Sequence, residues 1–170
     1  SDQTTRVNRL VGTVYADVTL FKNFVFRSNY GFDRRDERFL YFEPAFEVSS
    51  SQLNKTERTT RDTTKERTWL WENTVTYNKS WDDLRLTVLA GQSAQEYTYK
   101  KRNTINDTLQ PNGENIREWA MISYLFRANA VFFERYLVTA SLRTDGSSKF
   151  SKNNRWGYFP SVAVGWNVAQ

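Results

Sequence analysis

Strict alternation of apolar and mixed side chains constrains this chain more than any other feature. Between Glu118 and Phe133 every second residue is apolar: Ala120, Ile122, Tyr124, Phe126, Ala128, Ala130 and Phe132. The intervening residues are mixed and include Arg127 and Asn129. A helix would scatter both sets around its axis, whereas successive side chains of a strand point to opposite faces. The segment is therefore predicted to be a β-strand with one apolar face.

The same period of two recurs along the chain and predicts seven strands with no helix. The other six are expected at residues 9–20, 24–33, 68–77, 84–91, 136–145 and 156–168. Short turns near 21–23, 79–83 and 134–135 alternate with long gaps at about 34–65, 100–117 and 145–154. Residues 39–42 are apolar and either extend a strand into the first gap or lie in a loop. This alternation is typical of an up-and-down antiparallel sheet with one plain and one elaborated end.

Composition removes several classes of function. The 170 residues include no His and no Cys, so a disulfide scaffold, a Cys/His metal site and His-based catalysis are excluded. No constellation for an enzyme appears, and no cofactor is expected. The net charge is +5, but basic residues are interleaved with acidic ones, which argues against nucleic acid as a partner. A mean hydropathy of −0.71 and the absence of a long apolar run exclude a transmembrane helix.

Two interpretations of the apolar face remain open. It packs on the core of a soluble β-barrel or sandwich that binds a ligand, or it meets lipid in a membrane barrel. Long charge-free faces, small residues beside aromatic ones on the mixed faces, and Trp and Tyr near strand ends favour lipid. The residues expected to face lipid include Ile122, Tyr124, Phe126, Val138, Leu142, Val162, Val164 and Trp166.

The odd number of predicted strands bears on whether these residues can form a whole barrel. Single-chain bacterial barrels have even strand numbers, and an open edge in lipid leaves backbone groups without partners. Residues 1–170 are therefore expected to form part of one barrel domain and no complete independent domain.

The last fifty residues resemble a known family. The motifs are Arg135-Tyr136-Leu137-Val138-Thr139-Ala140-Ser141-Leu142-Arg143, then Asp145-Gly146-Ser147-Ser148-Lys149-Phe150, then Asn153-Asn154-Arg155-Trp156-Gly157-Tyr158-Phe159-Pro160-Ser161. They are similar to the barrel of SusC/RagA-type TonB-dependent outer-membrane transporters of Bacteroidota. The first ~115 residues fit by strand and loop pattern more than by motif.

The resemblance implies a 22-stranded barrel in the outer membrane with an N-terminal plug, which is expected to lie outside these residues. It also implies TonB as the energy source, a SusD-like surface lipoprotein, and oligosaccharide or peptide cargo. Alternation places one set of polar residues toward the lumen, where they would contact the plug, as we favour, or the cargo: Arg127, Asn129, Arg143 and Asp145. Aromatic residues of the long loops would either stack on sugar rings or extend strands: Phe39, Tyr41, Phe42, Tyr97 and Tyr99.

Overall fold

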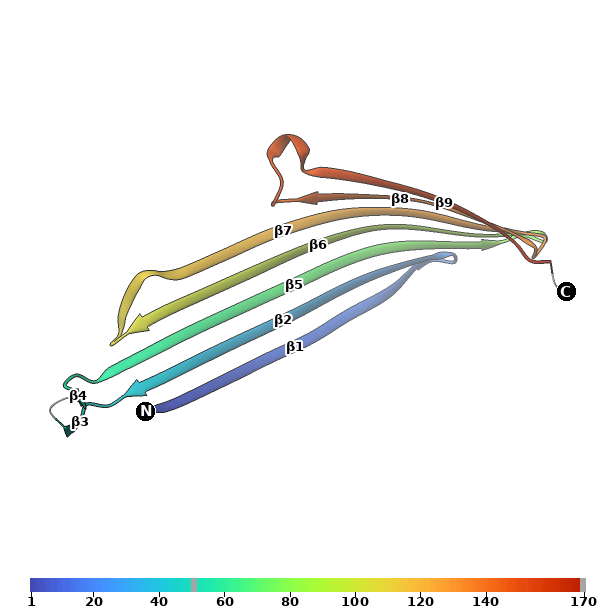
Figure 1. The fold of residues 1–170 in the computed structure, drawn as a ribbon. Coiled ribbons are helices and arrows are strands. Elements are labelled where there is room, and N and C mark those ends of the chain that lie inside the picture. Colours follow the sequence, from blue (N-terminus) through green and yellow to red (C-terminus); the bar gives the residue numbers. More distant parts are fainter. Residues whose placement is uncertain (50–51, 169–170) are drawn as a thin grey trace. The chain divides into compact units, whose positions relative to one another are not determined.

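Seven strands form one antiparallel sheet in the computed structural model, which describes residues 1–49 and 52–168 (Figure 1). Their order in the sheet follows the chain, β1-β2-β5-β6-β7-β8-β9. The strands are β1 (Asp2–Phe21), β2 (Phe24–Glu43), β5 (Arg58–Ser80), β6 (Leu84–Ile105), β7 (Thr108–Phe132), β8 (Tyr136–Ser147) and β9 (Trp156–Trp166). The prediction of an all-β, up-and-down antiparallel sheet of seven strands is confirmed.

Three small elements complete the fold. Between β2 and β5, the short strands β3 (Phe46–Ser49) and β4 (Gln52–Asn54) pair with each other as a separate antiparallel hairpin. A single 3₁₀ turn, η1 (Lys152–Asn154), lies in the connection from β8 to β9. Among the described residues, no helix is long and apolar enough to cross a membrane.

The chain divides into two compact units. Unit 1 contains Ser1–Gly12, Phe32–Thr68 and Tyr97–Glu118, and unit 2 contains Thr13–Gly31, Trp69–Glu96 and Trp119–Gln170. β8 and β9 lie wholly in unit 2, whereas the five longer strands divide their residues between the two units. Unit 1 is the smaller unit but holds more of the charged side chains, which include the run Asp33–Arg38.

Long loops were predicted at 34–65 and 100–117, but this prediction was wrong because most of these residues lie in strands. β2 continues to Glu43 and β5 already begins at Arg58, so only the β3–β4 hairpin and its flanks separate them. β6 and β7 are joined by a two-residue turn, Asn106-Asp107, whose φ angles of 47° and 61° are left-handed. Phe39, Tyr41 and Phe42 therefore lie on β2, and Tyr97 and Tyr99 lie on β6, which decides for strand extension over loops.

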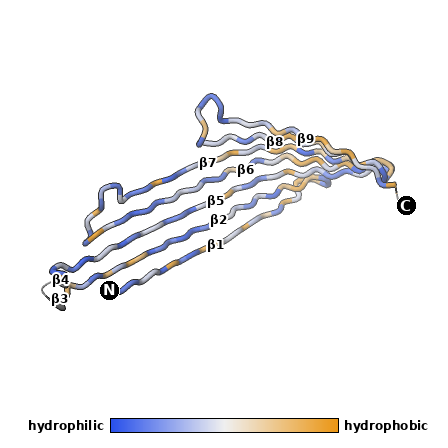
Figure 2. Tube along the Cα trace, viewed as in Figure 1, coloured by the Kyte–Doolittle hydropathy of each residue, from blue (hydrophilic) through white to orange (hydrophobic). Residues whose placement is uncertain are grey.

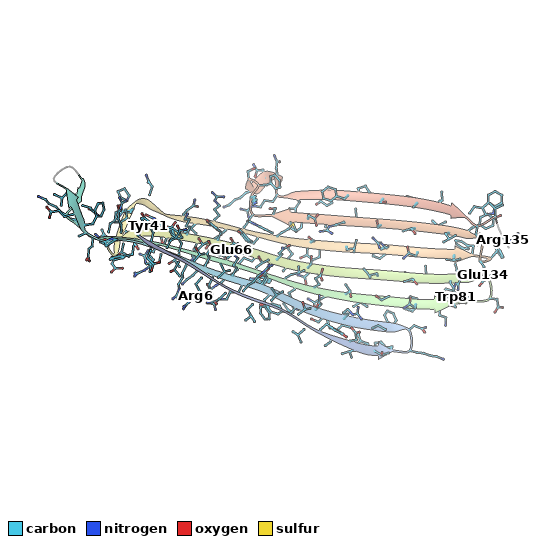
Figure 3. The ribbon with its side chains drawn as sticks, turned by 60° about the horizontal axis from the view of Figure 1, so that its bottom comes forward. Arg6, Tyr41, Glu66, Trp81, Glu134 and Arg135 are labelled. Carbon is cyan, nitrogen blue, oxygen red and sulfur yellow. The ribbon has the colours of Figure 1, made fainter. Side chains whose placement is uncertain are left out.

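The short turns predicted near 21–23, 79–83 and 134–135 are present, and they are tied to neighbouring strands and turns. The Asn78 amide donates to the Asn23 carbonyl at 3.0 Å, and the Phe133 amide donates to the Asp83 carbonyl at 2.8 Å. Phe133 and Glu134 both have left-handed φ angles, as a tight β7–β8 turn requires. Figure 3 shows Trp81, Glu134 and Arg135 together at this end of unit 2.

The sheet has no second layer. None of the hydrophobic side chains in the described part of the chain is buried, and both faces of the strands are open. A soluble sheet needs a layer that covers its apolar face, because that burial is the main source of its stability. Within the described residues the hydrophobic side chains are at most half-buried, so the sheet has little stabilisation from a core of its own.

Candidate functional site

Unit 2 separates its side chains into two faces. The register of β7, β8 and β9 aligns Phe126 with Leu142 and Pro160, and it aligns Ala128 with Ala140 and Val162. One residue along, Arg127 aligns with Ser141 and Ser161. Directly paired residues point to the same side of a sheet, so apolar rows alternate with rows of mixed polarity across the three strands. Figure 2 shows hydrophobic residues gathered along β8 and β9 toward the end of these strands at which the chain's C-terminus lies.

The eight residues predicted to face lipid share the apolar face. Seven of them are exposed, from 36% for Val138 to 79% for Val164, and Ile122 is half-buried. Val162 is 75% exposed although it lies at the middle of β9. A row of exposed aliphatic side chains in the middle of a sheet is unfavourable in water, so this face requires an apolar partner.

Aromatic pairs mark the two ends of the apolar face. Tyr124 stacks on Trp156 with ring centroids 6.1 Å apart, and Tyr136 stacks on Trp166 at 6.5 Å. Trp156 pairs in register with Gly146. A Cβ atom added to Gly146 would lie 3.1 Å from the Trp156 ring. Glycine at this position therefore lets the indole ring lie flat over the backbone of β8.

The spacing of these pairs defines a band. Trp156 and Trp166 are the first and last residues of β9, ten residue steps apart. At about 3.3 Å per residue the distance along the strand is about 33 Å. A tilt of about 40° reduces this to a height of about 25 Å, which is the height of the lipid-facing band of outer-membrane barrels.

Polar residues that interrupt the apolar face have partners there. Ser28 on β2 and Asn73 on β5 are polar residues at positions of the alternation that are otherwise apolar. The Trp71 indole Nε1 donates to Ser28 Oγ at 3.0 Å, and Asn73 Nδ2 donates to Gln92 Oε1 at 3.4 Å. Both bonds join neighbouring strands, so each of these polar side chains has a hydrogen-bond partner within the sheet.

The opposite face of unit 2 is charged. Arg27 makes two hydrogen bonds of 2.6 Å to the Asp17 carboxylate, and its guanidinium lies 5.6 Å from the Tyr15 ring centroid. Asn29 donates to Glu72 at 3.2 Å. With Thr74 these residues, apart from Asp17, line an open cavity of about 410 Å³. Asp17, Arg27 and Glu72 were not among the predicted site residues, although their place on the mixed faces was a usable signal.

The four residues predicted to face the lumen lie together on this charged face. Arg143 Nε donates to Asp145 at 2.8 Å, and Asn129 Oδ1 accepts a bond of 2.9 Å from Thr139 Oγ1. Arg127 is exposed, and its side chain makes no hydrogen bond or ion pair within the described part of the chain. A second cavity, of about 90 Å³, is lined by Arg143 and Ser123 together with Glu72, so the face is continuous from β5 to β8.

Unit 1 has a charged cluster of its own, in which Glu66 is labelled in Figure 3. Arg9 makes a bond of 2.7 Å to Asp33, and Arg35 lies 3.9 Å from Glu66. With Thr68 these four residues line a cavity of about 190 Å³. The hydrogen bonds from the Arg9 guanidinium hold the pKa of Asp33 below its ordinary value. Within residues 1–49 and 52–168, no group of acidic side chains is arranged to hold a metal ion.

Comparison with known proteins agrees with this geometry. No family model matches the chain. TonB-dependent receptor P39 of Formosa agariphila is 31% identical over 176 residues, which cover 92% of this chain and 16% of that protein. TonB-dependent receptor SusC of Bacteroides thetaiotaomicron is 43% identical over 70 residues, which cover 37% of this chain and 7% of SusC.

Solved structures give the same fold. The structure of the RagAB peptide transporter superposes with a TM-score of 0.82 at 20% identity, covering 96% of this chain and 20% of that chain. The closed-closed state of the RagAB peptide importer gives a TM-score of 0.85 with the same identity and coverage. The chain is a β-barrel segment of a SusC/RagA-type TonB-dependent receptor. It spans about a sixth of the length of the Formosa relatives that it matches.

Family membership accounts for the open sheet. A SusC/RagA-type receptor has more chain than these 170 residues, and the seven strands correspond to part of its β-barrel. Within the described residues, the outer edges of β1 and β9 have no partner strand.

Proposed function

We propose that this chain forms part of the wall of an outer-membrane transporter. The apolar face of unit 2 meets lipid, and the charged face lines the lumen. The observation that carries this proposal is the band on β7–β9, which is charge-free, about 25 Å high for strands tilted about 40°, and edged by stacked aromatic pairs. Tyr and Trp favour the two interfaces of a membrane, because one end of each ring system is apolar and the other is polar.

The alternative of a soluble ligand-binding module lacks support. Such a module would bury the apolar face, yet the hydrophobic side chains of the described residues remain unburied. The bonds of Ser28 and Asn73 also suit lipid, because a polar atom facing water needs no partner on the neighbouring strand. Neither observation excludes a chemical reaction, but the named relatives are receptors and transporters.

The charged face suits a lumen that holds other parts of the receptor. Arg127, Asn129, Arg143 and Asp145 lie on one face of the β7–β8 pair, and two of the four, Arg143 and Asp145, are already joined as an ion pair. An exposed ion pair gains little by itself, so its value here is to present ordered charges to a plug domain or to cargo. Contact with a plug is the simpler role, since a plug would fill the lumen.

Transport itself depends on chain outside these residues. We propose that the whole receptor imports oligosaccharides or peptides, takes energy from TonB, and works with a SusD-like surface lipoprotein. Support comes from the relative named SusC and from the likeness in fold to the RagAB peptide transporter. Whether the receptor imports oligosaccharides or peptides depends on its loops and its plug together.

Site-directed spin labelling of the full-length receptor tests the orientation. The chain contains no cysteine, so single Cys substitutions at Val138, Val162 and Val164 introduce unique labels here once cysteines elsewhere are removed. We expect these labels to be relaxed by oxygen, which dissolves in lipid. The matched labels at Thr139, Ser161 and Ala163 are one residue away on the opposite face, and we expect them to be shielded from lipid. Equal accessibility of the two sets would overturn the proposed orientation.

A further inference from the structure

The connection between β8 and β9 joins a basic surface to the apolar band. It contains Lys149, Lys152 and Arg155, and no acidic residue occurs from Gly146 to the end of the chain. All three basic residues are exposed. The connection follows Gly146, whose register partner Trp156 belongs to the aromatic pair that edges the band. Cationic side chains therefore lie at one rim of the proposed lipid-facing surface.

This connection is anchored to the sheet. The Ala120 amide donates to Ser148 Oγ at 2.8 Å, and the Ser148 amide donates back to the Ala120 carbonyl at 2.9 Å. The Ser147 amide donates to the Arg155 carbonyl at 3.1 Å, which closes the base of the connection. Lys149 Nζ lies 5.3 Å from the Trp119 ring centroid, so a cation–π contact holds it over β7. Arg155 Nε donates to the Phe150 carbonyl at 3.4 Å, so two of the three cations are restrained. A restrained cation loses less conformational entropy when it binds an anion.

An apolar groove begins beside these cations. It has a volume of about 250 Å³ and is lined by Ala120, Ile122, Gly146, Ser148, Arg155 and Trp156, among others. Ile122, Gly146 and Trp156 form one row of the apolar face. The groove is thus mostly apolar and has the Arg155 guanidinium at its edge. This arrangement matches a ligand with an acyl chain and an anionic headgroup.

The β8–β9 connection is longer than the β7–β8 turn at the other end of β8, and the longer connections of outer-membrane barrels are extracellular. We infer that the β8–β9 connection binds the phosphate-bearing headgroup of a lipid in the outer leaflet, with one acyl chain in the groove. This inference rests on the proposed membrane orientation. Lys149, Lys152 and Arg155 contact the phosphate oxygens, which cationic side chains at a membrane surface attract. The stacked Tyr124–Trp156 pair lies at the depth of the headgroups, where such rings are favoured.

Native mass spectrometry of the full-length receptor in detergent tests this site. The probes are a phosphorylated lipid A, its dephosphorylated form, and inorganic phosphate. We expect the phosphorylated lipid to bind more tightly than the dephosphorylated one. In the triple variant Lys149→Gln, Lys152→Gln, Arg155→Gln, we expect that preference to fall by about fivefold per cation, so by about a hundredfold in all.

Matched variants make the test specific. Lys55→Gln, Arg58→Gln and Lys65→Gln remove the same charge from exposed positions of unit 1, and we expect this variant to bind like the wild type. The single variant Lys152→Gln guards against misfolding of the triple variant, and resistance to unfolding on unheated gels checks the barrel. An unchanged preference in the triple variant, or an equal loss in the control, would overturn the inference. So would displacement of the lipid by inorganic phosphate at similar concentration.

The spin-label measurement separates this inference from the proposed function. Lipid accessibility at Val138 and Val162 without a phosphate preference would refute only the headgroup site. Equal accessibility of both faces would remove the membrane orientation and the headgroup site together.

Discussion

Single side chains decide which face of this sheet can meet lipid. Val162 lies at the centre of β9 between Ala140 on one side and the open edge of the sheet on the other. Ser161 is its immediate neighbour and points to the charged face. A change of one residue position therefore moves a side chain from the proposed hydrocarbon to the proposed lumen.

Replacement of Val162 by arginine tests that difference energetically. We expect Val162→Arg to lower the free energy of unfolding of the full-length receptor in bilayers by about 2–4 kcal/mol, because it places a cation near the bilayer midplane. Urea titration followed by tryptophan fluorescence measures the change. Ser161→Arg is the matched control, and a loss as large as that of Val162→Arg would contradict the assignment of faces.

The Arg9–Asp33 pair in unit 1 gives a prediction about pH. Hydrogen bonds from Arg9 lower the pKa of Asp33 in the folded state, so the pair stabilises the fold above the ordinary carboxyl pKa of about 3.9. This contribution is lost as the pH falls through the lowered pKa, because Asp33 is then protonated in both states. We expect hydrogen exchange at residues 2–12 to be slower in the wild type than in Asp33→Asn at neutral pH. The difference should disappear in strong acid, and a difference that persists there would contradict the assignment.

Strands show where sequence reasoning succeeds and where it fails. The seven strands were predictable because β7, β8 and β9 alternate strictly between apolar and polar residues. Their lengths were not, since in unit 1 both faces are polar and the alternation disappears, as in Lys100-Lys101-Arg102-Asn103. The β6–β7 turn at Asn106-Asp107 was missed because Pro111-Asn112-Gly113 has the stronger turn signal, although it lies within β7.

The charged face could be predicted only in part, because the alternation within one strand does not show which residues of other strands lie beside it. Parity alone placed Arg127, Asn129, Arg143 and Asp145 on one face. It could not show that Asp17, Arg27 and Glu72 continue that face on β1, β2 and β5, because strand register is a long-range property.

The β6–β7 turn offers a test at the level of one element. Asp107 has a φ angle of 61°, which glycine adopts freely and a β-branched residue does not. We expect Asp107→Val to destabilise the turn by about 1–2 kcal/mol and to speed hydrogen exchange at residues 103–110. Asp107→Gly removes the same exposed ion pair with Arg61 but keeps the backbone angle, so it should retain protection. Equal exchange in the two variants would show that the ion pair and not the backbone angle matters.

At the scale of the whole molecule, the sheet depends on surroundings that these residues do not supply. Neither face is covered, and the hydrophobic side chains of the described residues have no interior of their own. In the proposed orientation, the free energy that orders such long strands comes from lipid on one face and from the rest of the receptor on the other.

Expression of residues 1–170 alone tests this dependence. Without detergent we expect aggregated or unfolded material, because the apolar band and the edges of β1 and β9 are exposed. Size-exclusion chromatography and thermal unfolding by circular dichroism measure the outcome. A soluble monomer that unfolds cooperatively would contradict the membrane interpretation and would favour a ligand-binding module.

The stacked pair of Tyr136 and Trp166 also has an optical consequence. Tyr136 is the first residue of β8 and Trp166 is the last of β9, so their rings meet only when the two strands are paired along their whole length. At a centroid separation of 6.5 Å, excitation energy absorbed by the Tyr136 phenol is transferred almost completely to the Trp166 indole. Closure of this hairpin therefore carries an intrinsic fluorescence signal, which can follow insertion of the barrel without any added dye.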